Sequence, residues 1–199
     1  MSLLKIIAYG DPILRKQSAR IEEIDDDVKQ LADDMIETMK VAKGVGLAAP
    51  QVAVSRMLFV VDWSLLENEE IKNEGVVAYI NPVILSASED KVTEVEGCLC
   101  LPEIAAEVKR SNRIELSYQT LSGEEVKKEL TGYPARVIQH EFDHLQGILF
   151  IDRLSGSERA KIKRKIQDIL AGRIKPFDET QSEPKNLDKS KTRDDTVSL

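Results

Sequence analysis

The sequence has little of several features that mark familiar protein classes. Its 199 residues include only two histidines and two cysteines, and aromatic residues make up 5%. No apolar run approaches the ~18 residues that a membrane helix needs. Residues 3–8 are apolar but too few for the apolar part of a signal peptide. We therefore expect a cytoplasmic protein that makes no contact with a membrane.

The cysteines and the charge exclude two further classes. Cys98 and Cys100 are separated by a single residue, and a disulfide between such close positions would be severely strained. Both are therefore expected to be thiols of a reducing compartment. The net charge of −7 argues against a general nucleic-acid binder, and we expect no direct sequence-specific contact with nucleic acid.

The length and composition predict one domain with a sizeable core. Hydrophobic residues make up 42% of the chain, and a second domain in so short a chain would be cramped. We assign residues 1–172 to this domain. Residues 173–199 become polar and are expected to form a disordered C-terminal tail.

Hydrophobic spacing predicts the elements of this domain. Helical spacing is found over 25–42 and 155–171, whereas 67–74 is polar and is expected to be a surface loop. The pair Asn81-Pro82 indicates that its strand lies at an edge or carries a bulge. A run of strands with helices before and after it predicts an α+β fold, in which a mostly antiparallel sheet packs around a central helix, the one that carries a candidate metal-binding motif, with an N-terminal and a C-terminal helix. Strands are expected around 57–62, 76–85, 92–99, 105–109, 114–121 and 125–130.

Both histidines, His140 and His144, lie in one short stretch that is expected to be helical. Positions i and i+4 share one face of a helix, so the two imidazoles can bind one metal ion while Glu141 projects beside them. Pro134 suits the first turn of this helix, and Gly147 suits its C-terminal end. A single buried histidine is usually an ordinary core residue, but this pair with a glutamate between favours a metal site.

The third ligand cannot be a histidine, because the chain has no other. A metzincin would have its third histidine where Phe150 stands, so that class is excluded. A thermolysin-like site would take a downstream carboxylate, yet the candidate Glu158 lies in a basic amphipathic segment typical of a surface. Cys98 and Cys100 remain. In a regular strand both would face the same side, so spacing alone does not choose between them.

Three segments together resemble the motifs of one enzyme family. They are Gly44–Gln51 (GVGLAAPQ), Glu96–Pro102 (EGCLCLP) and Gln139–Gly147 (QHEFDHLQG). In this order they resemble the motifs GxGLAAxQ, EGCLS and QHExDHLxG of bacterial peptide deformylase, and the resemblance extends over about the first 170 residues. It implies a hydrolase that removes the formyl group from N-formylmethionine of nascent polypeptides and releases formate.

The resemblance also implies roles for particular residues. Glu141 is the general base, while the Gln51 side-chain amide and the Leu99 backbone N–H stabilise the developing oxyanion. The cofactor is one divalent metal ion, with Fe²⁺ as the first expectation and Zn²⁺ or Ni²⁺ as alternatives. The implied metal ligands are Cys98, His140 and His144. The implied substrate-binding residues are the backbone of Gly46 and Gly97, with Val45 and Val137 as candidates for the methionine pocket.

The chain departs from the family motif at Cys100, where serine is usual. Cys100 is expected to be either a small buried residue or an additional oxidation-sensitive thiol. Arg110 occupies the position of a family arginine. It is expected either to pair with Glu96 and hold the cysteine strand, or to be one of two solvated charges.

The predicted C-terminal helix is basic in an otherwise acidic chain. Residues 158–170 contain five basic and two acidic residues, whereas residues 1–157 contain 17 and 27. In related enzymes a C-terminal helix docks on the ribosome, so the resemblance implies such a contact for 158–170. The alternative is a helix that only packs on the domain through its apolar residues. The basic face comprises Lys161, Lys163, Arg164 and Lys165, and the apolar face Ile162, Ile166, Ile169 and Leu170.

Two other functions compete with the deformylase. One is a zinc metallopeptidase of the HExxH type, which makes no use of Cys98 or Gln51. The other is a catalytically silent, metal-stabilised binding module. A silent module has no need for Glu141 or Gln51, and both are present.

Overall fold

The computed structural model describes residues 2–66 and 69–177; the remainder of the predicted tail, 178–199, lies outside the described residues. Seven strands form a five-stranded sheet in the order β1-β2-β3-β6-β7 and a separate pair, β4-β5. Every pairing between neighbouring strands is antiparallel. The strands are β1 (Gly46–Ala48), β2 (Leu58–Asp62), β3 (Val76–Ala87), β4 (Lys91–Gly97), β5 (Ala105–Ser111), β6 (Arg113–Gln119) and β7 (Glu125–Thr131).

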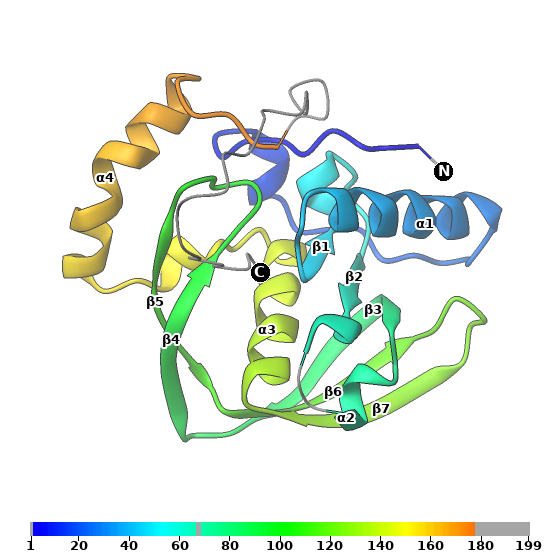
Figure 1. Cartoon of the computed structure of the whole chain (residues 1–199). Coiled ribbons are helices and arrows are strands. Elements are labelled where there is room, and N and C mark those ends of the chain that lie inside the picture. Colours follow the sequence, from blue (N-terminus) through cyan, green and yellow to red (C-terminus); the bar gives the residue numbers. More distant parts are fainter. Residues whose placement is uncertain (1, 67–68, 178–199) are drawn as a thin grey trace, which may run out of the picture.

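The helices surround this framework, with one of them at its centre. Figure 1 shows α3 between the β4-β5 pair and the five-stranded sheet, with α1 and α4 on opposite sides of the molecule. This arrangement confirms the predicted α+β fold around a central helix. The α-helices are α1 (Asp26–Val41), α2 (Glu69–Lys72), α3 (Tyr133–Leu145) and α4 (Gly156–Leu170). The 3₁₀ helices are η1 (Pro12–Arg15), η2 (Ala49–Val52), η3 (Trp63–Leu65) and η4 (Phe150–Arg153).

Two of the predicted helices begin at side-chain caps. The Asp25 carboxylate accepts a hydrogen bond from the Val28 backbone N–H at 2.9 Å and starts α1. The Ser155 hydroxyl accepts one from the Glu158 backbone N–H at 3.2 Å and starts α4. The apolar positions of α1 are buried at helical spacing, which fixes the helix against β1 and β2.

The strand that contains Asn81 lies at the centre of the sheet. β3 pairs with β2 on one side and β6 on the other, so the expected edge position is wrong, whereas the expected bulge is confirmed by register shifts between Ile80 and Val83 and between Ile84 and Ser86. Asn81 has φ +49°. Its side chain bonds the backbone N–H and C=O of Ile21 at 2.9 and 2.8 Å, which compensates for the interrupted ladder.

Three local expectations differ from the structure. The polar segment 67–74 contains the short helix α2 as well as loop. The strand predicted over 92–99 ends at Gly97, because the Leu101 backbone N–H turns back to the Cys98 C=O at 2.9 Å. Leu170 is 56% exposed and does not pack like Ile162 and Ile169, which are buried.

No helix among residues 2–66 and 69–177 combines the length and the hydropathy needed to cross a membrane.

Candidate active site

Three potential metal ligands meet beside α3. The side-chain donor atoms of Cys98, His140 and His144 all lie within 4.8 Å of one another, and all three residues are buried. Cys98 Sγ is 3.3 Å from His144 Nε2. Within the described residues, the buried Nε2 of His140 has no hydrogen-bond partner. One sulfur and two imidazole nitrogens around a single point, with a buried nitrogen lone pair unused, fit a divalent transition-metal ion.

Glu96 orients the His140 ring. His140 Nδ1 lies 2.9 Å from the Glu96 carboxylate, so this nitrogen carries the proton and Nε2 remains free to bind a metal. Burial lowers the pKa of His140, whereas the neighbouring Cys98 sulfur and Glu96 carboxylate raise it to about 10; a cation bound at Nε2 would replace the proton there and favour the neutral ring. A carboxylate behind the ring therefore fixes both its tautomer and its direction.

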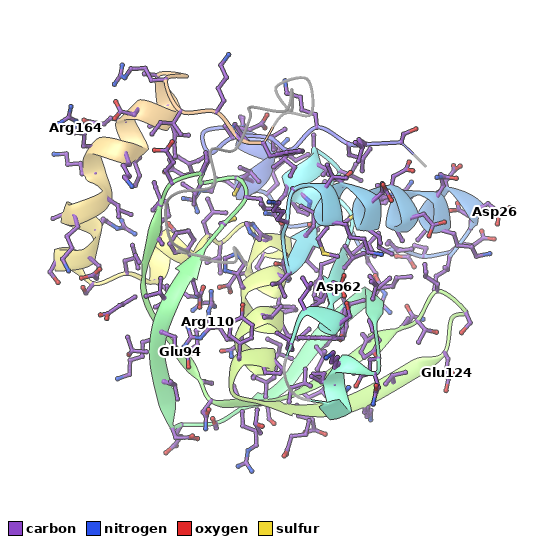
Figure 2. The ribbon with its side chains drawn as sticks, viewed as in Figure 1. Asp26, Asp62, Glu94, Arg110, Glu124 and Arg164 are labelled. Carbon is purple, nitrogen blue, oxygen red and sulfur yellow. The ribbon has the colours of Figure 1, made fainter. Side chains whose placement is uncertain are left out.

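Glu96 in turn is held by two arginines. Arg110 donates to it from Nε at 2.6 Å and from Nη2 at 2.8 Å, and Arg136 donates from Nη1 at 2.6 Å. Burial opposes ionisation of Glu96, but the hydrogen bonds from Arg110 and His140 hold its pKa well below the usual value. The Arg110 and Glu96 side chains are 2% and 0% exposed, so the alternative of two solvated charges is wrong. Figure 2 shows Arg110 between β4 and α3.

Sequence reasoning missed Arg136 and Asp143. Arg136 also donates to the Val92 and Val108 carbonyls at 2.7 and 2.9 Å and to Glu94 at 2.9 Å, which joins α3 to β4 and β5. The Asp143 carboxylate accepts from Arg110 Nη1 at 2.7 Å. Both residues lie on α3, four before and three after His140. A charged residue three or four positions from a metal-binding histidine, in a helix with buried apolar residues, is the sequence pattern that could have identified both.

Glu141 lies inside the site, beside the three potential ligands. Its side chain is fully buried, and within the described residues neither carboxylate oxygen has a hydrogen-bond partner. Burial raises the pKa of Glu141 to about 7, against the opposing effect of His140 and Arg110. A Cβ added to Gly46 would lie 2.4 Å from Glu141 Oε1. Glycine is needed at position 46 because the carboxylate of Glu141 occupies the space of a side chain.

Gln51 and Leu99 bring the other two motifs to the same point. Gln51 is fully buried in η2, its Oε1 accepts from the Ala48 backbone N–H at 2.7 Å, and its Nε2 lies 3.4 Å from Cys98 Sγ. Leu99 belongs to the tight turn that follows β4, next to Cys98. A Cβ on Gly44 would lie 2.9 Å from Leu99 Cδ1. The three motifs therefore converge on one site.

The second thiol lies directly beside the first. Cys100 is fully buried, and its Sγ is 3.1 Å from that of Cys98. Burial, with Cys100 adding to it, raises the pKa of Cys98 to about 12. A cation bound between the three ligands favours the thiolate and reverses this preference.

The residues expected to bind substrate lie in two places. Gly97 ends β4, where it pairs with Ala105, and it lines a cleft of about 400 Å³ that also includes Cys98 and Leu99. Val45 and Val137 are buried together in one core cluster and do not line this cleft. Their place in a methionine pocket stays a prediction.

The fold and the site define a metal-dependent hydrolytic enzyme: a thiol and two imidazoles converge, and an unpartnered carboxylate of raised pKa lies beside them. Comparison with known proteins narrows this class. The family model described as "Polypeptide deformylase" matches residues 3–160, and the chain belongs to this family.

Individual relatives are similar to this chain over most of its length. Peptide deformylase of Thermotoga sp. (strain RQ2) is 46% identical over 167 residues, which cover 84% of this chain and 96% of the relative. The crystal structure of peptide deformylase from Thermotoga maritima matches with a TM-score of 0.72 and 47% identity, over 78% of this chain and 99% of that one. The plant peptide deformylase PDF1B structure matches with a TM-score of 0.79 and 36% identity, over 85% and 90%.

The activity follows from the family. The chain is a metal-dependent enzyme that removes the formyl group from N-formylmethionine of nascent peptides. The zinc metallopeptidase and the silent binding module are both disfavoured.

Proposed function

We propose that Cys98, His140 and His144 hold one divalent ion at the point where their donor atoms converge, and that the ion is Fe²⁺. The convergence within 4.8 Å and the free Nε2 of His140 support this ligand set. The donor atoms suit zinc and nickel as well as iron, so they do not decide between these metals. The choice of iron rests on the family resemblance alone. When bound, such an ion polarises a carbonyl and makes a water more acidic.

Glu141 is the proton carrier of this proposal. A buried carboxylate whose pKa is raised to about 7 can accept a proton from the attacking water and return it to the departing amine near neutral pH. The observation that carries the proposal is that neither of its oxygens has a hydrogen-bond partner in the part of the chain that the structure describes. A purely structural carboxylate at this depth would be expected to have a hydrogen-bond partner.

Gln51 and Leu99 stabilise the charge that develops on the formyl oxygen. The Gln51 Nε2 group lies 3.4 Å from Cys98 Sγ, so the amide is already directed toward the proposed ligands. The Leu99 backbone N–H is the second donor. A preorganised donor of this kind contributes ~3 kcal/mol to lowering the barrier.

The peptide binds as an extended strand along the backbone of Gly46 and Gly97. Main-chain hydrogen bonds tolerate many sequences, as an enzyme that acts on all nascent chains requires. Val45 and Val137 contribute to the pocket for the methionine side chain. This catalytic unit comprises residues 1–172, and we place it in the cytoplasm, where nascent chains and reduced thiols occur together. The basic helix 158–170 contacts the ribosome.

Replacement of Glu141 by glutamine tests the assignment. Glu141→Gln keeps the shape and removes the proton carrier, so the variant should retain its metal and lose at least about 10²-fold in kcat for formyl-Met-Ala. Metal content and formate release are measured on the same preparation. Glu115→Gln, an exposed residue of β6, is the matched control and should be unchanged. Activity of Glu141→Gln within tenfold of wild type would remove Glu141 from the mechanism.

A further inference from the structure

The chain turns back toward the active site after α4. Gly172, at φ +69°, ends the helix, and the backbone N–H groups of Arg173 and Ile174 donate to the Asp168 carbonyl at 2.9 and 3.3 Å. Figure 1 shows the segment that follows α4 running back across the N-terminal segment. Phe177, half-buried, packs against the core cluster that contains Leu99. It lies beyond residue 160, where the family match ends.

Phe177 forms part of the cleft beside the proposed metal ligands. This cleft of about 400 Å³ includes Cys98, and its lining is mostly apolar. Val95 of β4 also lines the cleft and is 54% exposed, although it is large and apolar. The remaining apolar lining includes Leu99, Leu101, Ile104 and Phe177. An exposed apolar surface that continues directly from a catalytic site is typical of a substrate-binding site.

The position of this cleft matches the path of an extended peptide. Each residue of an extended chain advances ~3.3 Å. A peptide whose formyl group lies at the proposed ligands and whose backbone follows Gly97 passes Leu99 and reaches the cleft within a few residues. We propose that Phe177 is a specificity-determining residue, whose ring forms the part of this cleft that receives an apolar side chain downstream of formylmethionine. This inference rests on the proposed function.

Peptides of different length test the deformylase activity and the role of Phe177 separately. Formyl-Met-Ala tests deformylation alone, while formyl-Met-Ala peptides with leucine or serine at the third or fourth residue test the cleft. At one of these two positions the wild-type enzyme should prefer leucine by about tenfold in kcat/KM, chiefly through KM, because a hydrophobic subsite discriminates by this amount. The corresponding deformylated peptides should compete with the same preference, which measures binding without turnover.

Phe177→Ala should reduce the leucine preference to within about twofold and leave hydrolysis of formyl-Met-Ala unchanged. Because Phe177 also packs on the core, Val95→Ser on the exposed part of the cleft gives an independent measurement and should have the same effect. Pro176→Ala is the matched control and should keep the preference, since Pro176 lines the groove along the N-terminal segment, which Phe177 also lines, but does not line the cleft beside Cys98.

The results that would contradict the role of Phe177 differ from the result that would contradict the deformylase function. Absence of a leucine preference in the wild type, its persistence in Phe177→Ala, or its loss in Pro176→Ala would overturn the role of Phe177. Persistence in Val95→Ser would show that the exposed part of the cleft does not receive the side chain and would overturn it as well. Loss of formyl-Met-Ala hydrolysis in Phe177→Ala would show a structural role and also overturn it. Failure of the wild-type enzyme to hydrolyse formyl-Met-Ala would instead contradict the proposed function.

Discussion

At the scale of single residues, the site combines predictable ligands with supports that a sequence does not reveal. The spacing of His140 and His144 predicts a shared helix face, and the structure brings both near Cys98. The hydrogen bond from His140 to Glu96 was not predicted, because the two residues are 44 positions apart in the chain. Such contacts depend on how β4 packs against α3, which a local pattern does not specify.

The two adjacent thiols provide a prediction at this scale. Cys98→Ala should lose tight metal binding, because one soft ligand of three is removed, whereas Cys100→Ser restores the residue usual in the family and should keep it. Metal content after dialysis against a chelator distinguishes them. If Cys100→Ser loses the metal and Cys98→Ala retains it, the assignment of the ligand is reversed.

At the scale of elements, the sequence predicted α1, α3 and α4 well because caps and apolar spacing are local signals. The central position of β3 was not predicted. Asn81 and Pro82 interrupt a regular ladder locally, yet β3 is held from both sides by β2 and β6. The order of strands is a tertiary property and overrides a local preference for an edge.

An ion pair between two short elements gives a prediction of pH dependence. Arg15 of η1 donates from Nη2 to Asp152 of η4 at 3.1 Å. Burial alone would raise the pKa of Asp152, but the hydrogen bond from Arg15 holds that pKa below its ordinary value. Because the pKa of Asp152 is lower in the folded protein than in the unfolded chain, the ionised carboxylate stabilises the fold at pH values above its unfolded pKa of about 4. This stabilisation is lost as the pH falls through the pKa of the folded state.

Asp152→Asn should therefore lower the free energy of unfolding at pH 7 by at most about 1 kcal/mol, since both side chains are about a third exposed. The difference from wild type should shrink as the pH falls below about 3. Urea unfolding at pH 7 and at a pH below about 3 measures this difference in the free energy of unfolding. Asp26→Asn, at an exposed position, is the control. An equal difference at pH 7 and at low pH would show that the ion pair is not its source.

At the scale of the whole molecule, charge is segregated between the acidic body and α4. Two cations of the basic face are already engaged: Lys161 pairs with Glu158, and Lys165 donates to the Glu103 carbonyl. Lys163 and Arg164 are exposed, and Figure 2 shows Arg164 on the outer side of α4. These two residues are the best candidates for contact with a phosphate-rich surface.

Reversal of these two charges tests the ribosome contact. Lys163→Glu with Arg164→Glu should weaken co-sedimentation with ribosomes at low salt, and the wild-type interaction should fade as salt rises. Hydrolysis of free formyl-Met-Ala should not change, because Lys163 and Arg164 are exposed and do not line the cleft beside Cys98. Lys40→Glu with Lys127→Glu, both exposed elsewhere, is the matched control. Equal co-sedimentation of the α4 variant and wild type would leave α4 as a packing element only.

The central claim is that one metal ion, held by Cys98, His140 and His144, makes this chain a deformylase. The most direct measurement is an anaerobic titration of the chelator-treated protein with Fe²⁺, with formate release from formyl-Met-Ala recorded at each addition. Activity should be lost on chelation, rise in proportion to added metal and level off at one ion per chain. Formate release that persists without metal, or none at one bound ion per chain, would contradict the claim.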